Sequence, residues 1–233
     1  MRVSFSLAVA LAIGVSTAAY ADGYGPRSSY TPPYYDWSGI YVGGNGGGGW
    51  SDTTFDFKAA GVLLGAHPTG ALAGGQVGFN VQRGSWVFGA EYDGDWSGLR
   101  DHGVAPVAVD VVTKLHDLQT LTGRLGYAYN NVLVYAKGGW ATGEVSVNFA
   151  TGGIPVSEAS KRLNGGTVGG GIEYGLTRNI ILGVEYDYAH LDGRSFTAPP
   201  VVPFSETSLN VQSVVGRISY KFDWGQDRYV PLK

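Results

Sequence analysis

Apolar and polar side chains alternate along Trp86–Trp96, whose sequence is WVFGAEYDGDW. One set of alternate positions carries Trp, Phe, Ala, Tyr, Gly and Trp, and the other carries Val, Gly, Glu and two Asp. Because successive side chains of a β-strand point to opposite faces, this pattern predicts a strand with one apolar and one acidic face. The apolar face is aromatic at both ends, which is typical of a strand that faces lipid and meets both membrane interfaces.

Strands of this kind recur along the chain in hairpins with short polar turns. The turns are Arg83–Ser85, Asn130–Asn131 and Thr177–Asn179, and their Asn and Gly residues readily adopt the positive φ of tight turns. Trp37–Gly46 and Leu209–Phe222 are predicted as the first and last strands. The fold class is therefore an all-β, eight-stranded antiparallel transmembrane barrel, in which each hairpin strand is long enough to cross a bilayer at a tilt. The six hairpin strands are Ala71–Gln82, Trp86–Trp96, Gln119–Tyr129, Val132–Thr142, Gly165–Leu176 and Ile180–His190.

Four longer connections, rich in Gly, Pro and Asp, separate the predicted hairpins. An even number of strands, with short turns at one end and long loops at the other, is the bacterial outer-membrane pattern. We therefore expect the short turns and both chain ends in the periplasm and four long loops outside the cell. The predicted loops are Gly47–Gly70, Ser97–Leu118, Gly143–Asn164 and Leu191–Ser208.

The N-terminus predicts export. Arg2 gives a basic start, Val3–Val15 is mostly apolar, and Ala19-Tyr20-Ala21 is an A-x-A cleavage site, which together are the layout of a secretory signal peptide. The apolar stretch is too short to span a bilayer. The predicted parts are a signal peptide (1–21, cleaved after Ala21), a flexible periplasmic leader (22–36), an outer-membrane barrel (37–222) and a C-terminal tail (223–233).

Composition agrees with an exported membrane protein. Charged residues make up 15% of the chain, against about 25% in average globular proteins, and aromatic residues make up 13%. Such a surface suits lipid better than water. The formal net charge of −3 argues against nucleic-acid binding, which normally shows a basic footprint. The chain has no Cys, so neither disulfides nor thiol chemistry can contribute.

Extending the strand alternation around the barrel places ten charged side chains inside it. An eight-stranded barrel is only just wide enough for side chains to fill its interior, and an unpaired buried charge is costly. We therefore expect a lumen salt-bridge network that plugs the barrel, with a gated narrow ion path as the alternative. Paired carboxylates for glycoside hydrolysis are disfavoured because nothing in the sequence forms a sugar cleft. The ten predicted lumen residues are Glu91, Asp93, Asp95, Arg124, Lys137, Glu173, Glu185, Asp187, Arg217 and Lys221.

Several glycine-aromatic motifs resemble those of one family, the small outer-membrane immunogenic proteins. These are OmpA-like eight-stranded barrels that are often called porin-like. The resemblance covers about Trp37–Phe222 and implies that Phe222 is the final aromatic residue that the outer-membrane assembly machinery recognises. This chain departs from the family in continuing past that residue with Asp223–Lys233. The motifs are Trp37–Asn45 (WSGIYVGGN), Gly75–Asn80 (GQVGFN), Gly123–Tyr129 (GRLGYAY), Gly170–Tyr174 (GGIEY) and Gly216–Phe222 (GRISYKF).

We therefore expect a surface-exposed structural barrel of the Gram-negative outer membrane that maintains envelope integrity and has at most a narrow pore. Its expected partners are outer-membrane lipid, lipopolysaccharide and the assembly machinery. The alternative is a binding protein whose outer loops capture haem or a host or phage partner. A lipid A-modifying enzyme is a more distant alternative, since His190, Asp192 and Ser195 are close in sequence at an outer rim. Their sequence is equally ordinary turn chemistry, so no catalytic residue is assigned.

All four histidines lie in or beside the predicted outer loops, where a structural or incidental role is favoured. Some relatives of the resembling family are associated with hemin binding, and neutral imidazole is a common metal ligand. The resemblance therefore keeps haem open as a possible ligand of His67, His102 or His116. No two histidines have a chelating spacing, and we expect neither a resident cofactor nor a metal site.

Overall fold

The computed structural model describes residues 35–57, 62–105, 109–151, 154–192, 195–196 and 204–222, and their side chains except those in 53–66, 101–113, 147–159 and 193–208. The predicted signal peptide, most of the predicted leader and the predicted C-terminal tail lie outside these residues. Among the residues described, no helix is long and apolar enough to cross a membrane.

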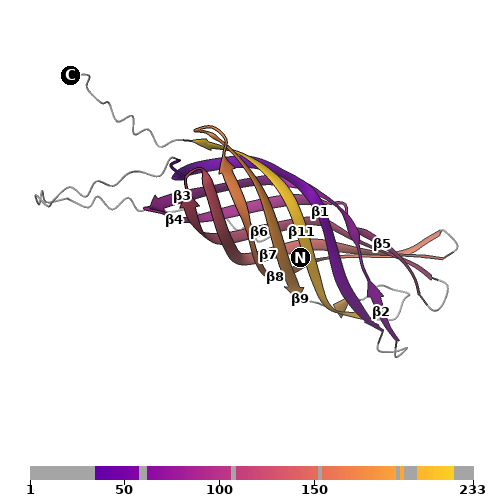
Figure 1. Cartoon of the computed structure of the whole chain (residues 1–233). Coiled ribbons are helices and arrows are strands. Elements are labelled where there is room, and N and C mark those ends of the chain that lie inside the picture. Colours follow the sequence, from indigo (N-terminus) through magenta and orange to yellow (C-terminus); the bar gives the residue numbers. More distant parts are fainter. Residues whose placement is uncertain are drawn as a thin grey trace, which may run out of the picture. The chain divides into compact units, whose positions relative to one another are not determined.

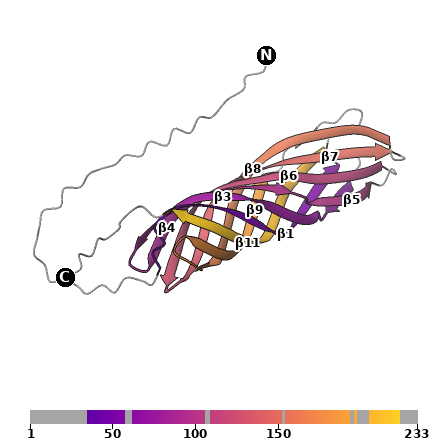
Figure 2. The same cartoon turned by 90° about the horizontal axis from the view of Figure 1, so that it is seen from above.

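Eight long antiparallel strands close into a barrel, as predicted (Figure 1). Each strand pairs with its neighbours in chain order, and β11 returns to pair with β1 from Ile40↔Phe222 to Asp56↔Ser205 (Figure 2). Three short strands, β2 (Val62–Ala66), β5 (Arg100–Ala105) and β10 (Ser195–Phe196), extend the sheet at one end of the barrel. The long strands are β1 (Gly39–Phe57), β3 (Thr69–Arg83), β4 (Trp86–Ser97), β6 (Val109–Tyr129), β7 (Val132–Thr151), β8 (Ile154–Gly175), β9 (Ile180–Asp192) and β11 (Phe204–Phe222).

Short turns connect the strands at the opposite end, where the sequence predicted them. Gly84 has a φ of +62° between β3 and β4, and Asn130 has a φ of +52° between β6 and β7. Glycine has no Cβ to clash at positive φ, and Asn tolerates it better than most residues. The predicted third turn lies between β8 and β9, where the Thr177 hydroxyl accepts a hydrogen bond from the Ile180 amide at 3.0 Å.

The strands continue well beyond the predicted membrane-crossing segments, so the four predicted loops are in part strand. Within them, residues 58–61, 106–108, 152–153, 193–194 and 197–203 lie outside the described residues. β7 and β8 pair as far as Thr151↔Ile154, and β5 and β6 occupy most of the predicted loop Ser97–Leu118. The predicted strands were limited to the length that crosses a bilayer, whereas backbone pairing can continue past that length. In these extensions the inner face is still closed, since Leu115, Val145 and Leu163 are buried.

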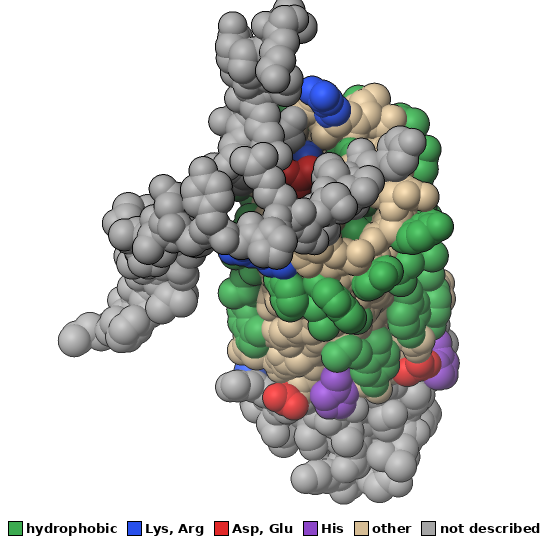
Figure 3. Space-filling view, turned by 60° about the vertical axis from the view of Figure 1, so that its left-hand side comes forward, with side chains coloured by type: hydrophobic (Ala, Val, Ile, Leu, Met, Phe, Trp, Pro, Cys, Tyr) green, Lys and Arg blue, Asp and Glu red, His purple; other side chains and the backbone are tan. Residues whose placement is uncertain are grey.

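Within the barrel wall, the two faces of each strand differ as predicted. Trp86 and Trp96 are 51% and 77% exposed, whereas Val87 and Glu91 are each 1% exposed. Val184 on β9 is likewise exposed beside the buried Glu185. On the face shown in Figure 3, hydrophobic side chains form a band across the middle of the barrel. The outer surface is therefore apolar along this part of the wall, and charged side chains such as Glu91 and Glu185 are inside.

Candidate functional site

Charged side chains from five strands meet inside the barrel. Every one of the five that form the centre of this group is at most 6% exposed. They are Glu91 from β4, Arg124 from β6, Lys137 from β7, Glu185 from β9 and Arg217 from β11.

Inward-facing glycines leave the space that these long side chains need. A Cβ added to Gly89 would lie 3.1 Å from the Arg124 Cγ, and a Cβ added to Gly171 would lie 2.8 Å from the Tyr135 hydroxyl. Real Cβ atoms essentially never approach other atoms closer than 3.0 Å, and the Val184 carbonyl oxygen would be 2.5 Å away, so no side chain fits at Gly171 unless both Tyr135 and the backbone shift. The small inward residues of one strand thus make room for the large polar residues of the next.

Glu91 lies at the centre of the lumen network. Its carboxylate accepts hydrogen bonds from the Arg217 guanidinium, at 3.0 Å for the Nη1–Oε1 pair, and from Arg124 Nη1 at 3.2 Å. The Tyr41 hydroxyl donates to the same carboxylate at 2.7 Å, and Lys137 Nζ lies 3.5 Å away. The Glu91 side chain is fully buried, so these partners replace its water shell.

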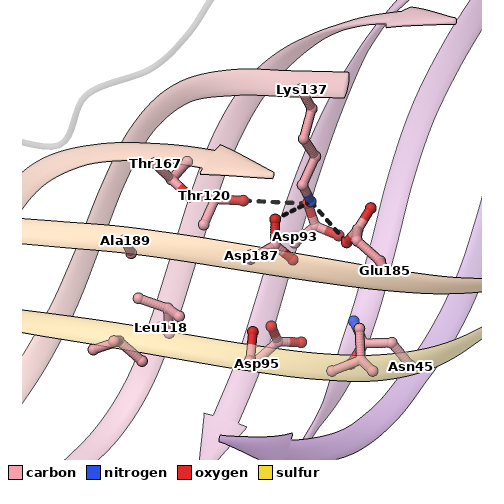
Figure 4. Close-up of a pocket in the computed structure, with 13 residues that line it drawn as sticks. Asn45, Asp93, Asp95, Leu118, Thr120, Lys137, Thr167, Glu185, Asp187 and Ala189 are labelled. Carbon is pink, nitrogen blue, oxygen red and sulfur yellow. Dashed lines mark hydrogen bonds and ion pairs between the residues drawn. The ribbon is translucent and has the colours of Figure 1, made fainter. Parts of the chain in front are cut away.

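Lys137 joins the acidic residues on the other side of the lumen (Figure 4). Its Nζ lies 2.8 Å from Glu185 and 3.2 Å from Asp93, with Asp187 at 3.3 Å. The oxygens of Glu91, Asp93 and Glu185 approach one another within 4.8 Å, a spacing that could hold a metal ion. Lys137 Nζ is within 3.5 Å of all three carboxylates, so an ammonium group already supplies the positive charge there.

Aromatic side chains hold the two arginines in place. The Arg124 guanidinium carbon lies 3.9 Å from the centroid of the Tyr135 ring, and its Nη1 donates to the Tyr41 hydroxyl at 2.7 Å. Arg124 also pairs with Glu173 at 2.9 Å. The Tyr135 hydroxyl accepts a hydrogen bond from Arg217 Nη1 at 3.2 Å. Both tyrosines were missing from the predicted network, although Tyr135 shares the strand face of Lys137 and could have been placed from that alternation.

Two predicted lumen residues lie outside the ion-pair network. Asp95 is half-buried, and its Oδ1 is buried without a hydrogen-bond partner in the described structure. Lys221 Nζ donates to the Asp36 carbonyl and lies 4.7 Å from the centroid of the Tyr35 ring. The other eight predicted residues form the network, which comprises Glu91, Asp93, Glu173, Glu185 and Asp187 with Arg124, Lys137 and Arg217.

Little open space remains beside this network. A cavity lined by Asn45, Asp93, Lys137, Glu185 and Asp187 has a volume of about 10 Å³. This is at the lower limit for one water molecule. The side chains thus fill the lumen at this level almost completely.

Aromatic residues that precede β1 fill the barrel end that carries the short turns. Trp37 was predicted to begin the first strand, but β1 begins at Gly39, and the Trp37 side chain is 0% exposed. Its ring lies 4.6 Å from that of Tyr35, whose hydroxyl donates to the Arg178 carbonyl at 3.2 Å. Together with inward-facing residues such as Leu133, they form a buried hydrophobic cluster. We call Tyr35–Trp37 the aromatic stopper.

The histidines do not share one loop. His67 lies between β2 and β3, and its Nδ1 is 2.8 Å from Asp52 Oδ1. His102 and His116 were expected in flexible loops, but they lie in β5 and β6, and the side chain of His102 is not among those described. His116 is exposed at a bulge of β6. Haem binding by these residues stays a prediction.

Among the candidate enzyme residues His190, Asp192 and Ser195, the histidine has an amide partner and not an acidic one. His190 Nδ1 lies 2.6 Å from Asn210 Oδ1, its cross-strand neighbour on β11. A catalytic triad instead needs the imidazole between an acid and a nucleophile. The side chain of Ser195 is outside the described set.

Comparison with known proteins gives a consistent result. A family model described as outer membrane protein beta-barrel domain matches residues 5–222. The chain is 33% identical over 166 residues to the 22 kDa outer membrane protein of Rhizobium leguminosarum bv. viciae, covering 70% of this chain and 69% of that protein. It is 31% identical over 204 residues to the 31 kDa outer-membrane immunogenic protein of Brucella melitensis biotype 1, covering 81% and 85%. The crystal structure of the outer membrane protein OprG from Pseudomonas aeruginosa aligns over 82% of this chain and 99% of that chain, with 14% identity and a TM-score of 0.49.

Proposed function

This chain belongs to the outer membrane protein β-barrel family, and from that premise we propose that it is a structural, non-enzymatic barrel that helps to keep the outer membrane sealed. In the proposed orientation the short turns and the aromatic stopper face the periplasm, and the strand extensions face outward. The observation that carries the proposal is the ion-pair network across the lumen.

A conducting pore needs a continuous path for water and ions. Here side chains from five strands meet inside the barrel, and the cavity beside Lys137 has a volume of only about 10 Å³. Arg124 and Arg217 each join two carboxylates, so moving either one aside breaks at least two ion pairs. The aromatic stopper fills the barrel end near the short turns, which supports a barrel closed at two levels.

Conductance of the purified protein in planar lipid bilayers tests the closed lumen. We expect the wild type to give small or intermittent currents. Arg124→Gln should raise the open probability, because Glu91 and Glu173 would lose the cation that they share and would repel each other. Arg83→Gln, at the exposed end of β3, is the matched control and should behave like wild type. Large, steady wild-type channels would overturn the proposal in favour of a porin.

The role in the envelope is tested in cells. Deletion of the gene should make the cells more sensitive to detergents and to large antibiotics that an intact outer membrane excludes. Complementation with wild type should restore resistance, and Arg124→Gln should restore it less at equal protein levels. A deletion strain as resistant as the parent would contradict a role in envelope integrity.

The orientation is tested by adding a protease to intact cells. We expect cleavage within the outward connections between β1 and β3, β4 and β6, β7 and β8, or β9 and β11. The short turns at Gly84–Ser85 and Asn130–Asn131 should be spared. Cleavage at those turns in sealed cells would invert the proposed orientation.

A further inference from the structure

Two basic side chains face each other on the outer surface of the barrel. Arg100 on β5 and Lys114 on β6 are cross-strand partners. Arg100 also pairs with Thr69 on β3. Thr69 is exposed and belongs to the face of β3 opposite to that of the buried Leu72. Cross-strand partners share a face, so both cations point outward. Like charges directly opposite each other in a sheet are destabilising, so this pairing calls for a compensating anion.

No protein side chain supplies that anion among the described residues, where neither Arg100 nor Lys114 forms an ion pair or hydrogen bond through its side chain. The neighbouring outward cation is different. Arg162 pairs with Asp117 at 2.9 Å and approaches Glu144 at 3.6 Å. Among the side chains that the structure describes, the Arg100–Lys114 pair therefore differs from Arg162 in having no acidic partner.

The height of the pair on the barrel indicates which anion is within reach. A single cross-strand row runs from Trp50 on β1 through Thr69 and Arg100 to Lys114. Trp96, near the end of β4 and four residues before Arg100 in the chain, is 77% exposed. Tryptophan concentrates where a bilayer meets water, so the row lies at the level of the lipid headgroups.

We propose that Arg100 and Lys114 together bind a phosphate group on the headgroup of an outer-leaflet lipid. The guanidinium presents two parallel N–H donors that match a phosphate, and the ammonium adds a point charge from the opposite side. The bound phosphate also removes the repulsion between the two cations. This inference rests on the orientation in the proposed function but not on whether the lumen conducts.

The test uses the refolded full barrel in detergent and native mass spectrometry with bisphosphorylated lipid A as the probe. Arg100→Gln/Lys114→Gln should weaken lipid A binding about 30-fold, since each cation near an anionic lipid surface contributes about 1 kcal/mol. Arg162→Gln is the matched control, because it removes an outward cation that already has acidic partners, and should leave binding within about twofold. Heat-modifiable mobility on gels shows that each variant is folded.

Two further probes identify the source of the phosphate. Dephosphorylated lipid A should bind the wild type as weakly as lipid A binds the double variant. Inorganic phosphate at equal concentration should not compete. Equal lipid A binding by wild type and double variant would overturn the proposal, as would full competition by inorganic phosphate, which would mean a site for free anions. Conductance and protease cleavage are separate measurements, so a failure here is distinguishable from a failure of the proposed function.

Discussion

Replacing Arg217 with Met should destabilise the folded barrel by about 3 kcal/mol. The Arg217 guanidinium contacts both Glu91 and Glu185, and its side chain is 2% exposed. Breaking a buried ion pair by removing one partner costs about 3–5 kcal/mol, because a charge is left without compensation. We expect the lower end of this range, since Lys137 remains 2.8 Å from Glu185 and Arg124 remains 3.2 Å from Glu91.

The assay is unfolding by guanidinium of protein refolded into phosphatidylcholine vesicles, followed by tryptophan fluorescence. A double-mutant cycle with Glu185→Gln isolates the interaction itself. The double variant should lose about 1–3 kcal/mol less than the sum of the two single variants, because removing both partners leaves no unpaired charge between them. Arg83→Met, at an exposed position, should change stability by less than about 0.5 kcal/mol.

Two results would refute this reasoning. A loss below about 1 kcal/mol for Arg217→Met would mean that water or Lys137 replaces the guanidinium at little cost. An additive cycle would mean that Arg217 and Glu185 do not stabilise each other, whatever their distance. Either result would also weaken the case for a lumen held closed by ion pairs.

Three further predictions test the lipid face, the stopper and the histidines. Val184→Arg should destabilise the barrel in the same vesicles by about 2–4 kcal/mol, the cost of Arg on the lipid face near the bilayer midplane, and a neutral effect would mean that Val184 does not face lipid there. Trp37→Ala should cost about 3–5 kcal/mol, as for a buried aromatic residue, and a loss below about 1 kcal/mol would show that the stopper is not packed in solution. In a hemin titration, wild type and a variant with His67, His102 and His116 replaced by Ala should give the same Soret band; a shift in wild type alone would instead assign haem to these residues.

Local patterns in the sequence were enough to predict the two faces of the barrel wall and its short turns. The alternation through Trp86–Trp96 identified the lipid face and the lumen face, and Gly84 and Asn130 marked turns that the structure places there. The strand ends were misjudged: β7 and β8 pair as far as Thr151↔Ile154, through residues that were predicted to form a loop. The predicted strands were limited to the length that crosses a bilayer, whereas backbone pairing is not limited by membrane thickness.

The contacts between side chains in the lumen could not be predicted without the closed barrel. Local alternation correctly turned Glu91 and Arg217 inward, but they are 126 residues apart, and β11 meets β1 only when the sheet closes on itself. Tyr35 and Trp37 had no periodic signal, because their environment is the interior end of a barrel that forms around them. The sequence by itself therefore determined which side chains face lipid, because side chains two residues apart in a strand point to the same face. Only the tertiary structure decided which charges pair and how the lumen is filled, because strand register and barrel closure set those distances.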